Sequence, residues 1–278
     1  MSATVTRPKV GVVKLASCDG CQLTLLDLED ELLPIAERFE LVEFPEATSR
    51  RWDGEFDVLL VEGSVSTPDQ AEELRRLRER SRMLVAIGAC ATAGGIQALR
   101  NHLDHGAVAA SVYPEPAWVE SLATSTPLTE HVRVDLELRG CPIDRGQLLE
   151  VLTALRVGRK PQLPDEAVCA TYKRRGLACV LVASGLPCLG PVTAAGCGAI
   201  CPAFGRACYG CFGPVPGANV AALSAQFSQL GHSDDEIGRA FAMFTSWAEP
   251  FRGPTAASLP IVAHPDRAKP GVASREPR

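Results

Sequence analysis

Eleven cysteines are the residues of this sequence best suited to chemistry, and their spacing divides them into three groups. The first thiol group combines a Cys-x2-Cys pair, a single cysteine and a Cys-Pro step, and comprises Cys18, Cys21, Cys90 and Cys141. Four thiolates bind either a zinc ion or an iron–sulfur cluster. A Cys-x2-Cys pair alone could instead be redox-active, and a single cysteine is often a small buried residue. Together the four predict a metal or cluster site.

Two further groups are compact in the sequence. The second thiol group is interleaved with glycines and comprises Cys197, Cys201, Cys208 and Cys211. Glycines let the main chain wrap closely and point its amides at cluster sulfurs. The third thiol group offers only three thiolates, with no obvious fourth ligand, and comprises Cys169, Cys179 and Cys188.

The charged residues around the second and third thiol groups are all basic. The segment Cys169–Cys211 holds no acidic residue and four basic ones, Lys173, Arg174, Arg175 and Arg206. A four-thiolate site is negative, and a basic lining would offset that charge. Zinc and iron–sulfur sites share this property, so charge does not choose the metal, and the basic run at 173–175 also fits a solvated loop.

The first 160 residues alternate between strand and helix patterns, which predicts an α/β domain with a parallel sheet. Strands are expected at Val10–Leu15, Phe39–Phe44, Phe56–Val61, Met83–Ile87 and Val132–Leu138. Apolar spacing predicts helices at Leu25–Ile35, from Thr67 to about Arg80, and at Asp144–Arg156. Thr67 before Pro68 is typical of a helix N-cap.

Each part of the first thiol group follows a predicted strand. The pair Cys18 and Cys21 follows the first strand, and Cys90 and Cys141 follow the strands that end at Ile87 and Leu138. Ligands bind beyond the carboxyl ends of the strands in such sheets. We therefore expect these four cysteines to meet at one edge of the sheet.

The character of the sequence changes after Pro161, which predicts two domains, 1–160 and 161–278. Gly, Pro and Cys become dense and regular periodicity is lost, so we expect an irregular domain. Its segment Cys169–Cys211 is not expected to build a conventional core of its own, and metal ligation can supply the missing folding energy. A helix-like stretch is expected at Ser233–Trp247. From Gly253 the tail is expected to run over a surface or to be disordered.

Composition limits the classes of function. A net charge of −5 without a basic stripe argues against nucleic-acid binding. No apolar run reaches the length of a membrane span, and Met1–Lys9 lacks the core of a signal peptide. Grouped cysteines in odd number then predict a cytoplasmic metalloprotein rather than a secreted disulfide protein.

Six short motifs resemble those of the small subunit of nickel–iron hydrogenases. They are Ser17–Cys21, Glu62–Val65, Gly88–Thr92, Gly140–Pro142, Gly190–Gly198 and Cys208–Pro214. The likeness extends from about Lys9 to Gly217, and more loosely to Arg252. It is greatest with the cytoplasmic sulfhydrogenase delta or NAD(P)-linked branch.

This resemblance implies a flavodoxin-like, doubly wound N-terminal domain and three iron–sulfur clusters. The first thiol group would hold a proximal [4Fe–4S] cluster and the second a medial [4Fe–4S] cluster, since exported relatives with a three-iron medial cluster have Pro at the place of Cys201. The third would hold a distal [4Fe–4S] or [3Fe–4S] cluster. Close relatives have a further cysteine where this sequence has Tyr172. By the same resemblance Glu62 is expected near the proximal cluster and the partner interface, where it would relay protons or bind the partner. The alternative is a turn carboxylate that caps the helix that follows it.

The resemblance also implies partners. No second pair of cysteines remains for a nickel site, so hydrogen chemistry would occur in a nickel–iron large subunit, and electrons would pass to iron–sulfur and flavin NAD(P)-reductase subunits. The sequence contains no glycine-rich phosphate loop, so we expect no flavin or nucleotide site in this chain. The alternatives are a complex I-like quinone- or formate-linked subunit, which would lack the second cysteine-rich domain, and a zinc-binding structural protein.

Overall fold

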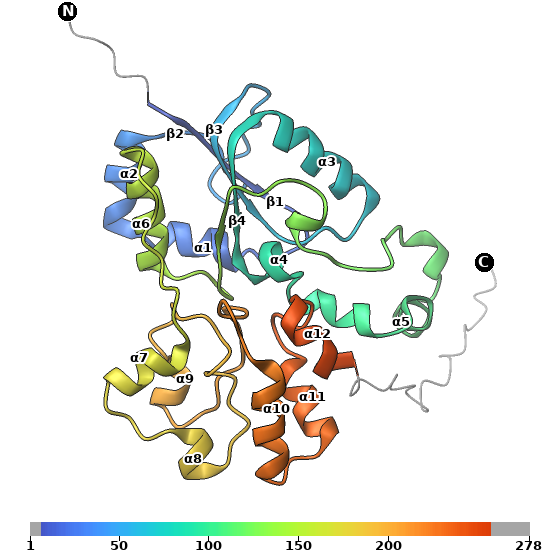
Figure 1. Cartoon of the computed structure of the whole chain (residues 1–278). Helices are drawn as coiled ribbons and strands as arrows, with labels where there is room; N and C mark the ends of the chain where they lie inside the picture. Colours follow the sequence, from blue (N-terminus) through green and yellow to red (C-terminus); the bar gives the residue numbers. More distant parts are fainter. Residues whose placement is uncertain (1–6, 257–278) are drawn as a thin grey trace, which may run out of the picture.

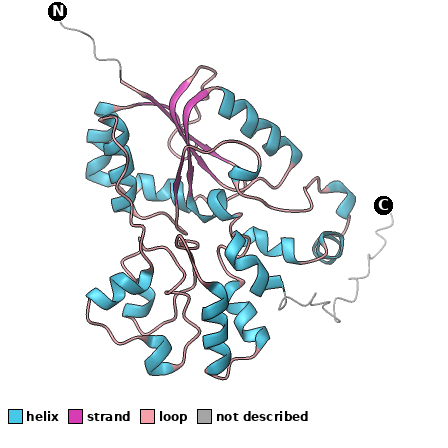
Figure 2. Cartoon of the chain, viewed as in Figure 1, coloured by secondary structure: helices cyan, strands magenta, loops and turns pink. Residues whose placement is uncertain are grey.

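The computed structural model describes residues 7–256, and its N-terminal part is a five-stranded parallel sheet (Figures 1 and 2). The strands lie in the order β2-β1-β3-β4-β5. Their bounds are Lys9–Lys14 (β1), Glu40–Glu43 (β2), Phe56–Glu62 (β3), Ser81–Ile87 (β4) and Leu136–Leu138 (β5). This order is that of flavodoxin-like doubly wound sheets, which confirms the predicted fold class.

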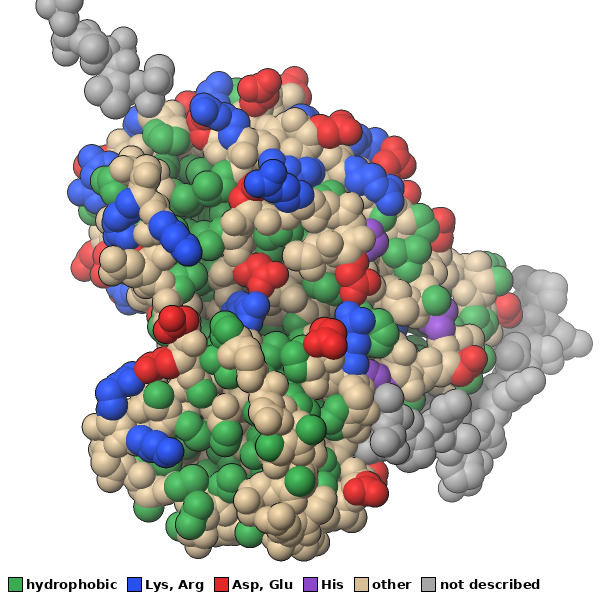
Figure 3. All heavy atoms as spheres, viewed as in Figure 1, with side chains coloured by type: hydrophobic (Ala, Val, Ile, Leu, Met, Phe, Trp, Pro, Cys, Tyr) green, Lys and Arg blue, Asp and Glu red, His purple; other side chains and the backbone are tan. Residues whose placement is uncertain are grey.

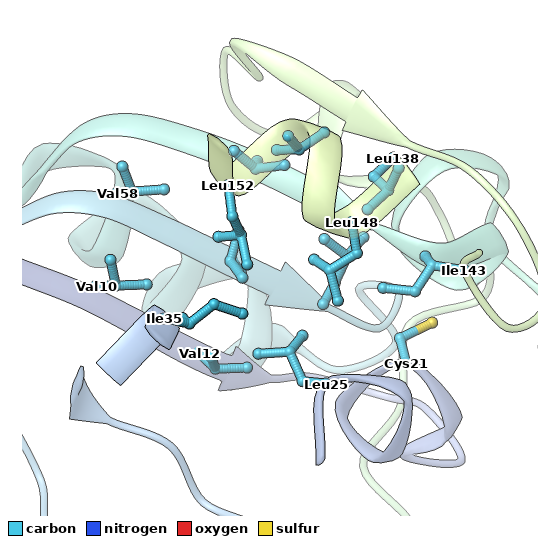
Figure 4. Packing of buried hydrophobic residues seen from close by; sticks show 14 of the residues in the cluster. Val10, Val12, Cys21, Leu25, Ile35, Val58, Leu138, Ile143, Leu148 and Leu152 are labelled. Atoms are coloured by element: carbon cyan, nitrogen blue, oxygen red, sulfur yellow. The ribbon is translucent and has the colours of Figure 1, made fainter. Parts of the chain in front are cut away.

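One face of the sheet is covered by helices α1 (Gly20–Leu26), α2 (Leu32–Arg38) and α6 (Arg145–Arg156). Figure 4 shows Val10 and Val12 of β1 packing towards Leu25 of α1 and Leu148 of α6. These residues are almost completely buried, and Cys21 belongs to the same cluster. The apolar packing therefore fixes the helix that carries one cysteine of the first thiol group.

The opposite face packs against α3 (Pro68–Glu79) through Leu74 and Leu77. Thr67 accepts a hydrogen bond from the Gln70 amide, and the Gln70 side chain bonds back to the main chain of Thr67. This capping box confirms the predicted helix start. Between β4 and β5 the chain makes α4 (Gly88–Ala93), the 3₁₀ helix η2 (Ile96–His102) and α5 (His105–Val112).

The C-terminal region is built from six helices and, among the described residues, contains no strand. They are α7 (Val168–Arg174), α8 (Val180–Ser184), α9 (Ile200–Ala203), α10 (Val220–Gln229), α11 (Asp234–Phe241) and α12 (Glu249–Ala256). Phe227, Phe241 and Phe251 are fully buried beside Cys188 and Cys208. Helices α10–α12 lie outside the segment Cys169–Cys211 and supply these apolar side chains, so the cysteine-rich segment shares a core with them and does not build one of its own.

Several predicted boundaries differ from the structure. The helix expected at Leu25–Ile35 is broken into α1 and α2, with Glu29 at a positive φ between them. Only the last three residues of Val132–Leu138 are strand, because Asp135 side-chain and main-chain atoms bond Leu84 before the pairing begins. The stretch Ser233–Trp247 is helical only in α11, and the tail from Gly253 starts within α12 and otherwise lies outside the described residues. No helix among residues 7–256 is long and apolar enough to cross a membrane.

Candidate functional site: three groups of thiols

The first thiol group gathers at the carboxyl edge of the sheet, as the strand ends predict. Cys18 lies in the loop after β1 and is exposed, whereas Cys21 on α1 is buried. Cys90 lies on α4, directly after β4, and Cys141 follows β5. Three separate strand ends therefore deliver four thiols to one place.

Electrostatic coupling shows that these thiols are neighbours. Burial raises the pKa of Cys90 to about 11, and the charges of Cys141 and Cys18 add to the rise. Burial also raises the pKa of Cys21, with smaller contributions from Glu62, Cys90 and Cys141. Burial raises the pKa of Cys141 as well, and the charges of Cys18 and Glu62 add to the rise. Buried thiols held this close resist ionisation, and a bound cation would stabilise their thiolates.

Two glycines leave room for the sulfurs. A Cβ at Gly88 would stand 2.4 Å from the Cys21 sulfur, and one at Gly95 would stand 2.5 Å from the Cys90 sulfur. Both glycines have positive φ, at 86° and 70°. These positions therefore need glycine for conformation and for space.

Glu62 is buried at the end of β3 and caps a helix, but not the one expected. Its carboxylate accepts hydrogen bonds from the amides of Cys21 at 3.1 Å and Gln22 at 3.3 Å, at the start of α1. Burial raises the pKa of Glu62, and these amide bonds oppose the rise. The carboxylate thus holds the helix that carries Cys21, and the expectation that it caps the following helix was wrong.

The second thiol group is assembled by the loop around α9 and the turn after it. Burial raises the pKa of Cys211 to about 12, and the charges of Cys197, Cys141 and Cys201 add to it. Burial raises the pKa of Cys208 to about 12, with contributions from Cys188 and Cys211. Each of these two thiols therefore has neighbours in its own group and in another group.

The third thiol group surrounds a small cavity of about 10 Å³ that Cys169, Cys179, Cys188 and Tyr172 line. Burial raises the pKa of Cys169 to about 11, and Cys188 and Cys179 add to the rise. The Tyr172 hydroxyl donates to the carbonyl of Ala178. The phenol therefore borders the three thiols while its proton is held elsewhere.

Specific contacts join the three groups into a line. Cys141 lies close enough to Cys211 to act on its pKa, since the charge of the Cys141 thiol raises that pKa and the Cys141 main chain lowers it, which links the first group to the second. The amide of Cys208 donates to the Cys188 sulfur at 3.2 Å, which links the second group to the third. Arg139 reinforces the first link by donating to the carbonyl of Pro214 at 2.7 Å.

The four basic residues of the segment Cys169–Cys211 lie around the second and third thiol groups, but they make different contacts. Lys173 lowers the pKa of Cys169, and Arg206 is coupled to Cys201. Arg174 pairs instead with Glu166, and Arg175 donates to the carbonyl of Gly198 at 2.7 Å. Figure 3 shows a face of the C-terminal region with few charged side chains. Only two of the four basic residues thus act directly on thiols.

The donor set suits iron–sulfur clusters, since all three groups consist of closely coupled thiols. A four-thiolate zinc site needs every sulfur about 2.3 Å from one ion. In the described part of the chain, no group of three or more His, Cys, Asp or Glu side chains is placed to hold a single metal ion.

Sequence reasoning missed one residue of the site, Gln97. Its carbonyl oxygen is 3.7 Å from the Cys90 sulfur, and its amide nitrogen donates to Ser64 and to the carbonyl of Ala16. The paired Gly94 and Gly95 before it were the available signal, because both have positive φ and turn the chain back onto Cys90.

Comparisons with known proteins place this chain among hydrogenase subunits. It is 39% identical over 239 residues to the protein named sulfhydrogenase 2 subunit delta of Pyrococcus furiosus, covering 86% of this chain and 100% of that protein. It is 31% identical over 172 residues to the delta subunit of the NAD-reducing hydrogenase HoxS of Cupriavidus necator, covering 56% of this chain and 82% of that protein.

A family model and a solved structure agree with these relatives. Residues 18–155 match the family described as NADH ubiquinone oxidoreductase, 20 Kd subunit, and this range includes the whole first thiol group. A chain from the crystal structure of an NAD⁺-reducing [NiFe]-hydrogenase in the H2-reduced state aligns with a TM-score of 0.53 and 32% identity, over 57% of this chain and 96% of that chain. The protein therefore belongs to the family of hydrogenase small subunits that includes the sulfhydrogenase delta subunit.

Proposed function

We propose that this chain is the electron-transfer subunit of a cytoplasmic nickel–iron hydrogenase and connects the nickel–iron site of a partner large subunit with NAD(P)-reductase subunits. The observation that carries the proposal is the line of three thiol groups, joined through Cys141 and Cys211 and through Cys208 and Cys188. Three bound iron–sulfur clusters would supply one-electron redox chemistry at these groups.

The residues of this chain would hold those clusters in a fixed order. Cys18, Cys21, Cys90 and Cys141 would be the ligands of the proximal cluster, a [4Fe–4S] centre. The second thiol group would hold a medial [4Fe–4S] cluster, and the third a distal [4Fe–4S] or [3Fe–4S] cluster. The exposure of Cys18 supports the placement of the large subunit against the first group.

Glu62 and the basic residues would tune this arrangement. Glu62 holds the start of α1 and so orients Cys21. Lys173 beside Cys169 and Arg206 beside Cys201 would offset the negative charge of the distal and medial sites. We propose that Glu62 acts as a positioning carboxylate.

A second candidate is a complex I-like, quinone- or formate-linked subunit, which the family match over residues 18–155 favours. The C-terminal region argues for the hydrogenase, since the sulfhydrogenase delta subunit aligns over 86% of this chain. The two candidates differ in whether a nickel-containing partner accompanies the chain.

The test is anaerobic purification of the tagged chain from its host, followed by exposure of the complex to H2. The proposal predicts a co-purifying nickel protein and bleaching of the visible absorption by H2. A Cys21→Ser complex should be bleached by dithionite but not by H2. The substitution removes only the proximal cluster, through which electrons from H2 would enter the chain. A complex without nickel that H2 does not bleach would contradict the proposal.

A further inference from the structure

Residues 106–120, which run from α5 through the 3₁₀ helix η3 (Pro116–Trp118), form an apolar arm outside the core. The only charged residues of this arm are Glu115 and Glu120, and all but two of the others are apolar. None of its residues is buried, and the Trp118 side chain is 85% exposed. Large apolar side chains that gather on an exposed surface mark a site of interaction.

Hydrogen bonds hold the apolar arm in this exposed place at both of its ends. The Asp104 side chain caps the start of α5 at 2.6 Å. The Ser121 hydroxyl lies 3.0 Å from Nε2 of His105, which closes the arm at its base. Arg100 donates to the carbonyl of Leu122 at 2.9 Å. The arm is therefore an anchored projection, and the fold itself keeps its apolar side chains in solvent.

The apolar arm is continuous with the surface around the first thiol group. Helix η2 contacts both α5 and α4, the helix that carries Cys90. At the start of η2, the Ile96 side chain is 49% exposed. Its neighbour Gln97 donates to the carbonyl of Ala16 at 2.8 Å, two residues before the exposed Cys18. A protein that covers Cys18 is therefore close to Ile96 and, beyond it, to the arm.

Charge and position distinguish this surface from the other end of the molecule. The arm has acidic residues and no basic ones, whereas the segment Cys169–Cys211 has basic residues and no acidic ones. In Figure 1, α5 lies away from α7 and α8 of that segment. A partner at the arm needs an apolar pocket with a basic rim, and a partner at the third thiol group needs an acidic surface.

We propose that the apolar arm, together with Ile96, is a docking surface for the nickel–iron large subunit, in which Trp118 enters an apolar pocket with basic residues at its rim. The inference rests on the proposed function, because it takes the large subunit as the protein that covers Cys18. Tryptophan is enriched among the few residues that carry most of the binding free energy of an interface. Trp118 is then the anchor of this surface, and Glu115 and Glu120 orient the partner.

The test measures nickel and acid-labile sulfide per tagged chain in the anaerobically purified complex, after a fixed wash at low protein concentration. Trp118→Ala removes the anchor, and we expect the retained nickel to fall by about tenfold while the sulfide is kept. Val112→Asp, at the exposed end of α5, should have the same effect. Phe204→Ala is the matched control, because it truncates an exposed aromatic side chain at the end of α9 and should keep the nickel.

Salt gives a second measure of the same surface. Glu115→Lys should lower the retained nickel at low ionic strength, and the loss should become smaller as salt screens the charge. A loss that is the same at every salt concentration would contradict the basic rim.

The outcomes separate this inference from the proposed function. Full nickel in both Trp118→Ala and Val112→Asp would overturn the docking surface and leave the hydrogenase assignment intact. Loss of the flavin-containing subunits, or of self-association alone, with nickel retained would assign the arm to another partner and also overturn the inference. A wild-type complex without nickel would instead remove the proposed function, and the inference with it.

Discussion

The main-chain amide of Cys208 donates a hydrogen bond to the Cys188 sulfur over 3.2 Å. These two cysteines belong to different thiol groups, so the bond places the second and third groups in direct contact. Main-chain N–H groups aimed at sulfur are typical partners of cluster ligands. The contact supports the order of the three sites along the proposed line.

Replacing Cys188 tests that order. Cys188→Ser should remove the distal cluster, and iron content should fall by about three to four atoms per chain. The EPR signal of the proximal cluster should be retained, while the medial signal should shift, because the Cys208 amide loses its sulfur acceptor. Val182→Ser, an exposed change on α8, is the control and should retain full iron. Loss of the proximal signal in Cys188→Ser would contradict the separate assignment of the groups.

The glycine beside Cys21 gives a second prediction. Gly88→Ala introduces a Cβ at 2.4 Å from the Cys21 sulfur, whereas Gly158→Ala meets nothing within 4 Å. Both glycines have positive φ, so each change costs about 1–2 kcal/mol in backbone strain. Only Gly88→Ala should lower the iron content, by about four atoms. Equal iron in the two variants would show that Cys21 is not a ligand.

Tyr172 offers a third prediction, for the site with three thiols. Tyr172→Phe should retain the distal cluster, because the hydroxyl is occupied by the carbonyl of Ala178. Tyr172→Cys places a fourth thiol at the cavity that Cys169, Cys179 and Cys188 line, and should raise the iron content by about one atom if the native cluster has three irons. A lost distal signal in Tyr172→Phe would make the phenol a ligand.

A fourth prediction concerns pH and the contact between the two regions. His102 on η2 lies edge-on to Trp247, 5.4 Å away, and burial lowers its pKa from 6.5. The unfolded chain then binds this proton more readily, so the free energy of unfolding should be highest above about pH 6.5 and fall as the pH decreases below it. His102→Phe keeps a ring against Trp247 and should reduce that fall, measured as the urea midpoint by tryptophan fluorescence. An unchanged slope would exclude His102 as the cause.

Much of the sheet and of the first thiol group could be predicted from the sequence. Apolar runs such as Phe56–Val61 are bounded by turn residues, and a cysteine after a parallel strand must lie at the carboxyl edge. The break between α1 and α2 could not be predicted, because Leu25 and Leu28 keep helical spacing while the chain turns at Glu29. In α10, the spacing of Val220, Leu223 and Phe227 was a signal that pointed to a buried helix.

The contact of Gln97 with Cys90 is harder to predict from the sequence than the sheet is. It depends on two successive glycines with positive φ, whose conformations the sequence permits but does not require. The links between thiol groups likewise depend on how the C-terminal region lies against the end of the sheet (Figure 1), which brings Cys141 close to Cys211. Packing between distant segments leaves no pattern in any short stretch of the sequence, so it could not be predicted.

The central claim is that the eleven cysteines hold three iron–sulfur clusters, and a metal count tests it most directly. Iron, acid-labile sulfide and zinc would be measured together on the anaerobically purified complex. The account predicts about eleven to twelve irons per chain with a similar amount of sulfide, and eleven would indicate a three-iron distal cluster beside Tyr172. About two or three zinc ions per chain without sulfide would contradict the account and make the cysteines structural.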